Sequence, residues 1–169
     1  LYSSNIFNDT LVVGGGNGFH LVNTKNFSIK KFPEIDKGKG WEIYEDDKKK
    51  EIYLRILKKG IFKIKFNDIN SYDDYSLEKY TYENGLPDNF YSINFLNLNN
   101  EVLYSTDKGI YKKDQENKFI LDDRFFNLPS YQFKKVDSFI NLSNGKSWLV
   151  FSENKNSQRQ VAIYEVDNN

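Results

Sequence analysis

The chain has 169 residues, with 24 Lys and Arg side chains against 24 Asp and Glu, so its formal net charge is zero. That length fits one domain, and the balanced charge argues against a strongly basic nucleic-acid face. Hydrophobic residues make up 38% of the chain, which argues against intrinsic disorder. Cysteine is absent, which excludes disulfide frameworks, Cys-ligated zinc and Cys nucleophiles. Alanine, the best helix former, occurs once, at Ala162, while Tyr, Phe and Ile abound, so composition favours an all-β protein.

Alternation of apolar and polar residues predicts strands along the whole chain. In chain order they include Leu11–Val13, Phe27–Phe32, Trp41–Glu45, Tyr53–Leu57, Phe62–Phe66, Leu77–Tyr82, Tyr91–Phe95, Val102–Thr106, Lys118–Leu121, Val136–Ile140, Ser147–Phe151 and Val161–Val166. Turn residues separate them, among others at Gly14–Gly18, Lys58–Gly60 and Asp107–Gly109. A helical turn is expected only within Ser71–Glu83.

A repeat appears when the chain is aligned on a glycine that is followed by an apolar residue. Gly18, Gly60 and Gly109 lie 42 and 49 residues apart, and each follows a strand and a tight turn. In this alignment Val12 stacks on Leu54 and Leu103. A looser fourth copy has Trp148 at that position, then a longer loop before its next strand at Val161–Tyr164.

Four short strands in about 45 residues are typical of a β-propeller blade. The sequence therefore predicts four blades of antiparallel strands, at about residues 1–35, 36–86, 87–130 and 131–169. The chain opens mid-pattern at Leu1 without an initiator methionine, so we expect it to be part of a larger propeller. Such a slice would expose two unpaired blade faces, because a single blade cannot bury both of its faces.

One copy carries a recognisable motif. Asn84-Gly85-Leu86-Pro87 precedes a strand, a turn and a second strand that ends in Thr106-Asp107-Lys108-Gly109-Ile110. This resembles the two-component regulator propeller repeat, and Asn144-Gly145 with Trp148 matches the turn and tryptophan of another copy. The second copy departs from the family pattern, with Ile56-Leu57 in place of Gly-Thr.

The resemblance implies an extracytoplasmic, periplasmic or extracellular, ligand-sensing segment of a bacterial two-component or related regulator. A glycan or small molecule is the expected ligand, and other blades or domains of the same polypeptide, or a second copy in a homodimer, are the expected protein partners. Membrane attachment would come only through segments outside this sequence. The segment itself is expected to be non-catalytic and to bind no nucleic acid. Two alternatives stay open: a secreted or surface propeller that acts as an interaction scaffold, and a glycan-active propeller enzyme.

Inner strands of a propeller begin at the ring mouth, where ligands usually bind. Trp41, at the start of one such strand, and Phe90 with Tyr91, at another, are therefore candidate ligand contacts. Arg55 joins them if it faces outward from its neighbouring strand. His20, the only histidine, is the last candidate, with simple packing or solvation as its alternative.

Other motifs favour structural roles. Gly14–Gly18 lacks the spacing and the following helix of a phosphate-binding loop. The acid pairs Asp46-Asp47, Asp73-Asp74 and Asp122-Asp123 are expected to be solvated loop tips, and Trp148 is expected to pack between blades. Three N-x-S/T sequons, at Asn8, Asn26 and Asn141, are close to the number expected by chance. No cofactor and no metal site are predicted.

Overall fold

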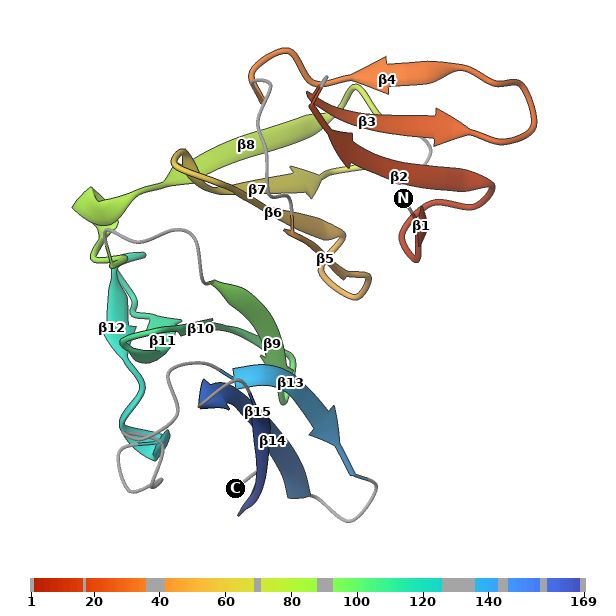
Figure 1. The fold of residues 1–169 in the computed structure, drawn as a ribbon. Coiled ribbons are helices and arrows are strands. Elements are labelled where there is room, and N and C mark those ends of the chain that lie inside the picture. The colour runs from red at the N-terminus through yellow and green to blue at the C-terminus, as the bar shows by residue number, and fades with distance from the viewer. Residues whose placement is uncertain are drawn as a thin grey trace. The chain divides into compact units, whose positions relative to one another are not determined.

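The computed structural model describes residues 2–16, 18–35, 42–68, 71–87, 93–125, 136–142, 146–155 and 158–167. These residues form four antiparallel sheets and two single-turn 3₁₀ helices, an all-β fold (Figure 1). The chain divides into two compact units, Leu1–Thr81 and Tyr82–Asn169, each of which holds two sheets.

In the first unit, strands that are consecutive in the chain pair with one another, so both sheets are simple meanders. The first sheet contains β1 (Tyr2–Ser3), β2 (Thr10–Gly15), β3 (Gly18–Asn23) and β4 (Ile29–Lys31). The second sheet contains β5 (Glu42–Asp46), β6 (Glu51–Ile56), β7 (Gly60–Phe66) and β8 (Tyr75–Tyr80).

The second unit repeats this plan. The third sheet contains β9 (Asn94–Leu98), β10 (Glu101–Thr106), β11 (Gly109–Lys113) and β12 (Phe119–Leu121). The fourth sheet has three described strands, β13 (Val136–Asn141), β14 (Lys146–Lys155) and β15 (Gln158–Asp167). The helical turns are Tyr82–Asn84 and Asp123–Phe125. The first of these overlaps the end of Ser71–Glu83, where the sequence allowed a helical turn, and six of the residues of that segment form β8.

Alternation decides which side chains enter the cores. In β7, Phe62, Ile64 and Phe66 point into the core of the first unit, and Lys63 and Lys65 lie on the opposite face, as the period-two pattern predicts. The core of the first unit combines residues of both of its sheets with Phe7, Phe32 and Ile35, which belong to the connections. The sheet residues are Val12, Phe19, Leu21, Ile52, Leu54, Ile56, Phe62, Ile64 and Phe66. The core of the second unit is likewise shared by its two sheets: Leu96, Leu98, Leu103, Ile110, Phe125, Val136, Leu149 and Phe151.

The three repeat glycines occupy equivalent places. Gly18, Gly60 and Gly109 are the first residues of β3, β7 and β11, and their φ angles are 108°, 113° and 130°. Side chains other than hydrogen rarely tolerate these angles. At Gly60 a Cβ atom would also lie 2.2 Å from the carbonyl oxygen of Tyr80. The glycine is therefore the right anchor for aligning the repeat.

The strand before the glycine, however, is out of register in the second copy. Gly15 pairs with Gly18 and Thr106 pairs with Gly109, so two residues connect the strands in the first and third sheets. In the second sheet Ile56 pairs with Gly60, so three residues connect them. The alignment of Leu54 with Val12 and Leu103 is therefore wrong in structural terms, because the extra residue in the turn moves every side chain of β6 to the other face.

In both units the two sheets pack on each other through equivalent faces. The residue after the glycine, Phe19 in the first sheet and Ile110 in the third, lies in the core shared with the sheet that follows. In the second sheet, the opposite face of the glycine strand, with Phe62 and Ile64, contributes to that core. The two units therefore repeat one packing mode as well as one strand order.

The fourth sheet differs from its prediction. The sequence predicts a longer loop after Phe151, but β14 and β15 pair continuously from Lys146↔Asp167 to Lys155↔Gln158. The residues of the expected loop are mostly polar, so apolar alternation could not reveal that their backbones continue the ladder.

Candidate functional site

The structure describes only two of the five residues that the sequence singles out as ligand contacts. Trp41, Phe90 and Tyr91 lie outside the described residues, so the predicted site at the starts of the inner strands cannot be assembled from them. Arg55 and His20 are both described, in the second and first sheets of the first unit.

Arg55 is held by a neighbouring strand. Its Nε lies 3.3 Å from Oε2 of Glu42, its direct register partner on β5, and its side chain is 12% exposed. This ion pair fixes the guanidinium along the sheet face and compensates its charge. The arrangement gives Arg55 a structural partner inside the second sheet.

His20 sits between Val13 on β2 and Lys31 on β4, near the β2–β3 turn. The side chain is half-buried, and its Nδ1 is buried without a hydrogen bond to any residue that the structure describes. The two candidates are not brought together. His20 lies on the face of the first sheet that points away from the shared core, and Arg55 lies on the face of the second sheet that points away from the same core.

The acid pairs are only partly solvated. Asp46 is 4% exposed and Asp122 is 1% exposed, so the prediction of solvated loop tips is wrong for these two. Asp46 accepts a hydrogen bond from the backbone nitrogen of Lys49 at 3.1 Å, and Asp122 accepts one from that of Arg124 at 3.2 Å. Each carboxylate folds back to cap the turn that follows it, which removes it from water.

A polar network lies around Lys63, on the face of the second sheet that points away from the core of the first unit. Its Nζ lies 3.0 Å from Oε1 of Glu51 and 3.4 Å from Oε1 of Glu78. The Tyr53 hydroxyl donates a hydrogen bond to Glu51 at 2.7 Å, and the Tyr80 hydroxyl donates one to Glu78. Each carboxylate therefore has one cation and one hydroxyl as partners.

Neither Tyr80 nor Lys63 is prepared as a general base. Burial raises the pKa of Tyr80 far above its ordinary value, and the hydrogen bond to Glu78 raises it further. Burial alone would lower the pKa of Lys63, but the hydrogen bonds and charges of Glu51 and Glu78 together outweigh it and raise that pKa. Both groups keep their protons at neutral pH, whereas a general base needs a pKa near the working pH. We therefore read the network as structural.

A second polar feature is an open cavity of about 370 Å³ at one end of the first sheet. Three elements line it. The β1–β2 loop provides Ile6, Phe7 and Asn8, the end of β3 and the β3–β4 turn provide Asn23, Asn26 and Ser28, and the β7–β8 connection provides Tyr72. The volume is within the range of about 300–1,000 Å³ that is usual for small-molecule sites.

The loops around this cavity are tied together. The backbone nitrogen and Oγ1 of Thr24 donate to the carbonyl oxygen of Asp9 at 2.7 and 3.0 Å. Ser4 Oγ accepts the backbone N–H of Phe7 at 3.1 Å and donates to Glu45 at 2.7 Å. Burial raises the pKa of Glu45, although its hydrogen bonds from Asn5 and Ser4 oppose this shift. The cavity is thus bounded by loops with defined conformations.

Sequence reasoning missed this cavity. It noted Asn8 and Asn26 only as members of chance sequons, and it expected ligands at the opposite ends of these strands. The only available signal was the concentration of asparagine in the two loops that flank β2 and β3. Nothing in the local sequence shows that Tyr72, 64 positions after Asn8, closes the same cavity.

Within the described ranges, His, Asp and Glu side chains form no group of three or more that could hold a metal ion. The same part of the chain contains no helix with the length and hydrophobicity needed to cross a bilayer.

The chain was compared with protein families and with curated proteins. No family model matches it, and no curated protein sequence matches it significantly. The comparisons therefore assign neither a family nor a function to the chain.

Proposed function

We propose that this chain is a non-catalytic, ligand-sensing β-propeller segment from the extracytoplasmic region of a bacterial two-component or related regulator. In this proposal the four sheets are blades, with the boundaries 1–35, 36–86, 87–130 and 131–169. The observation that carries it is the repeated packing mode: in both units, the face bearing the residue after the turn, Phe19 or Ile110, packs on the following sheet.

Strand order supports this proposal. Each sheet is a meander of neighbouring strands, and the glycine that opens the third strand recurs in the first three sheets. Meandering sheets of four strands, repeated every 40 to 50 or so residues and stacked face to face, are typical of propellers.

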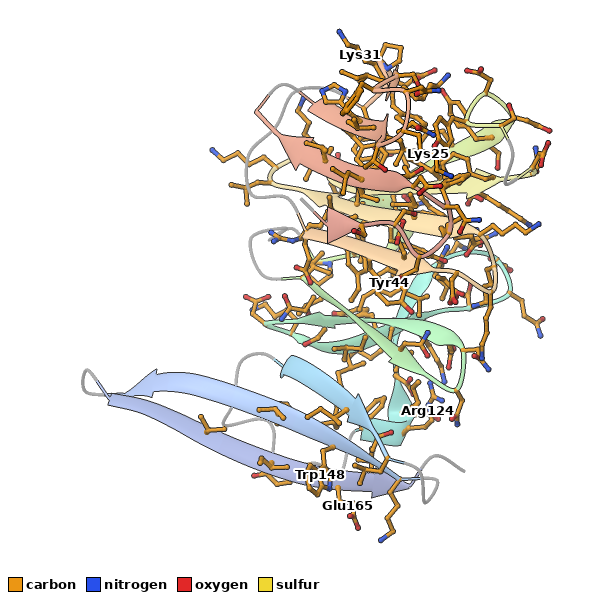
Figure 2. The ribbon with its side chains drawn as sticks, turned by 90° about the vertical axis from the view of Figure 1, so that its right-hand side faces the viewer. Lys25, Lys31, Tyr44, Arg124, Trp148 and Glu165 are labelled. Carbon is orange, nitrogen blue, oxygen red and sulfur yellow. The ribbon has the colours of Figure 1, made fainter. Side chains whose placement is uncertain are left out.

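The outward face of the fourth sheet supports it as well. Ile140, Trp148, Val161 and Ile163 are 45%, 38%, 55% and 58% exposed. Trp148 and Glu165, which face each other across β14 and β15, project on this side in Figure 2. An exposed apolar sheet face of this kind favours a partner sheet, and a further blade of the same polypeptide would provide one.

The regulatory role rests on the resemblance of Asn84–Pro87 and of the strand before Gly109 to the two-component regulator propeller repeat. Ligand binding would shift the packing between blades or protomers, and a downstream kinase or transcription module would read that shift.

The test is the complete reading frame, followed by a reporter assay in the host. We expect a transmembrane helix and a kinase or DNA-binding module downstream, and loss of ligand-dependent transcription when the segment 1–169 is deleted in frame. A secretion tail without an output module would instead support the interaction scaffold. Turnover of a glycan by the complete protein would overturn the non-catalytic assignment.

A further inference from the structure

We propose that the cavity at the end of the first sheet is a binding site for a small neutral polyhydroxylated compound, such as a sugar ring or a cyclic polyol. Its lining is formed by Ile6, Phe7, Asn8, Asn23, Asn26, Ser28 and Tyr72. The inference rests on the proposed ligand-binding function, but it places a ligand at the strand ends opposite to those that the sequence predicts.

The charge of the site selects against ions. All seven lining residues are uncharged. Charged residues of the flanking segments are paired with one another: Lys25 Nζ lies 2.7 Å from Oδ2 of Asp9, and Lys30 Nζ lies 2.5 Å from Oδ1 of Asp73. The lining therefore offers an ionic ligand no opposite charge, and its polar groups suit a neutral ligand.

Two amide groups of the site have a defined orientation. Asn23 Oδ1 accepts the backbone N–H groups of Lys25 and Asn26, at 2.9 and 3.1 Å. Asn26 Oδ1 accepts the backbone N–H of Ser28 at 2.9 Å. Since the Oδ1 atoms accept the backbone N–H groups of the turn, the Nδ2 groups of both asparagines remain as donors. Neither these groups nor the side chains of Asn8 and Ser28 have a hydrogen-bond partner within the described part of the chain.

The hydrogen-bond direction at Tyr72 adds an acceptor. Thr10 Oγ1 lies 2.9 Å from the carbonyl oxygen of Asn8, to which it donates its only proton. The 2.6 Å contact between Thr10 Oγ1 and the Tyr72 hydroxyl must then be donated by Tyr72. The Tyr72 oxygen keeps its lone pairs for a ligand hydroxyl. Donors and an acceptor thus line one cavity, and a hydroxyl group, which both donates and accepts, can satisfy both kinds.

The site is organised before any ligand arrives. The β3–β4 turn is closed by Phe27 N donating to Asn23 O at 3.0 Å, with Phe27 held at φ 59°. The Phe7 ring packs edge-on against Tyr72 with centroids 4.9 Å apart, which fixes the orientation of the tyrosine. Ligand binding would therefore cost little ordering of the protein.

The experiment is a nuclear magnetic resonance titration of the complete sensor region, in which backbone amide shifts report the contacted residues. The probes are glucose, N-acetylglucosamine, cellobiose and myo-inositol at millimolar concentrations, with glucuronate as the charged comparison. We expect at least one neutral probe to shift the amides of residues 6–8, 23–28 and 72, and glucuronate to bind no better.

Variants make the assignment specific. Asn8→Ala should weaken binding by about fivefold, the effect of one lost hydrogen bond, and Ser28→Tyr should abolish it by filling the cavity. Asn5→Ala is the matched control, since Asn5 is an exposed asparagine of the same loop that does not line the cavity. Its affinity should equal that of the parent, and each variant is first checked for an unchanged fold by its spectrum.

Several results would overturn the inference. They are the absence of shifts with every probe, unchanged binding by a folded Ser28→Tyr variant, and shifts that cluster around Arg55 and His20 instead. The last result would leave the proposed ligand-sensing function standing, because a ligand would still bind. A reading frame without an output module would overturn the proposed function alone, whatever the titration shows.

Discussion

The guanidinium of Arg124 donates hydrogen bonds to both oxygens of the buried Asp122 carboxylate. Nε lies 2.9 Å from Oδ1 and 3.1 Å from Oδ2, and Nη2 lies 2.5 Å from Oδ2. Arg124 also reaches Glu101 at 2.6 Å, so these contacts tie the helical turn after β12 to the first residue of β10. Hydrogen bonds to Asp122 and Glu101 outweigh burial and raise the pKa of Arg124, which stays charged at any pH at which the fold exists.

Breaking this pair should destabilise the second unit. Asp122→Asn removes the buried one of the two carboxylates that pair with Arg124 and leaves Glu101 as its charge partner. We expect a loss of about 2 kcal/mol in the free energy of unfolding, below the full cost of a buried pair because Arg124 is partly exposed. The measurement is urea unfolding followed by circular dichroism. Asp123→Asn is the control, since its side chain is 74% exposed. Equal losses in the two variants would contradict this account.

Gly60 should not tolerate a side chain. Gly60→Ala places a Cβ atom 2.2 Å from the Tyr80 carbonyl oxygen at a φ of 113°, so we expect a loss of at least about 2 kcal/mol. Thermal and urea unfolding would measure it. Gly15→Ala introduces the same methyl group at a strand position with nothing within 4 Å, and its effect should be small. A similar stability for both variants would show that the β6–β7 turn relaxes freely.

The outward face of the fourth sheet should drive self-association of the isolated segment. Ile163→Lys should reduce oligomer formation in analytical ultracentrifugation and the binding of a hydrophobic dye, with little change in unfolding free energy, because Ile163 is 58% exposed. Leu149→Ala on the buried face should instead cost about 2–5 kcal/mol. If Ile163→Lys associated as strongly as the parent, the outward face of the fourth sheet would not be the surface that drives association.

Alkaline pH should destabilise the first unit through Tyr80 and Lys63. Both pKa values are raised in the folded state, Tyr80 by burial and Glu78, and Lys63 by the carboxylates that outweigh burial. Above pH of about 10 the unfolded chain releases these protons while the folded chain keeps them, so stability is retained below that pH and falls above it. Urea unfolding between about pH 8 and 11 would show the fall, which Tyr80→Phe should reduce. The same substitution at the exposed Tyr82 controls for the loss of one hydroxyl, and equal profiles for both would contradict the assignment.

The sequence alone predicts most strands but not their exact partners. The alternation in Phe62–Phe66 identifies β7 and both of its faces, since the pattern is a property of the strand itself. The register of β6 could not be predicted, because it depends on whether two or three residues form the turn before Gly60. The polar ends of β14 and β15 carry no apolar pattern, and so their pairing was not visible either.

The candidate site was less accessible to sequence reasoning. Asn8, Asn26 and Tyr72 come from three connections, and only packing of the first sheet on the second brings them to one cavity. Asp122 resembled a solvated turn residue, because its role as a cap for the backbone N–H and the guanidinium of Arg124, two positions on, is visible only once the turn is seen.

The extra residue in the β6–β7 turn has a practical consequence for protein engineering. A consensus blade averaged column by column would place Leu54 with Val12 and Leu103, and so combine side chains that face different neighbours across the sheet. The consensus residue chosen at that column would fit neither environment. A gap placed in the first and third copies, opposite one of Leu57, Lys58 and Lys59, restores the correspondence and sets Tyr53 in the column of Val12 and Leu103.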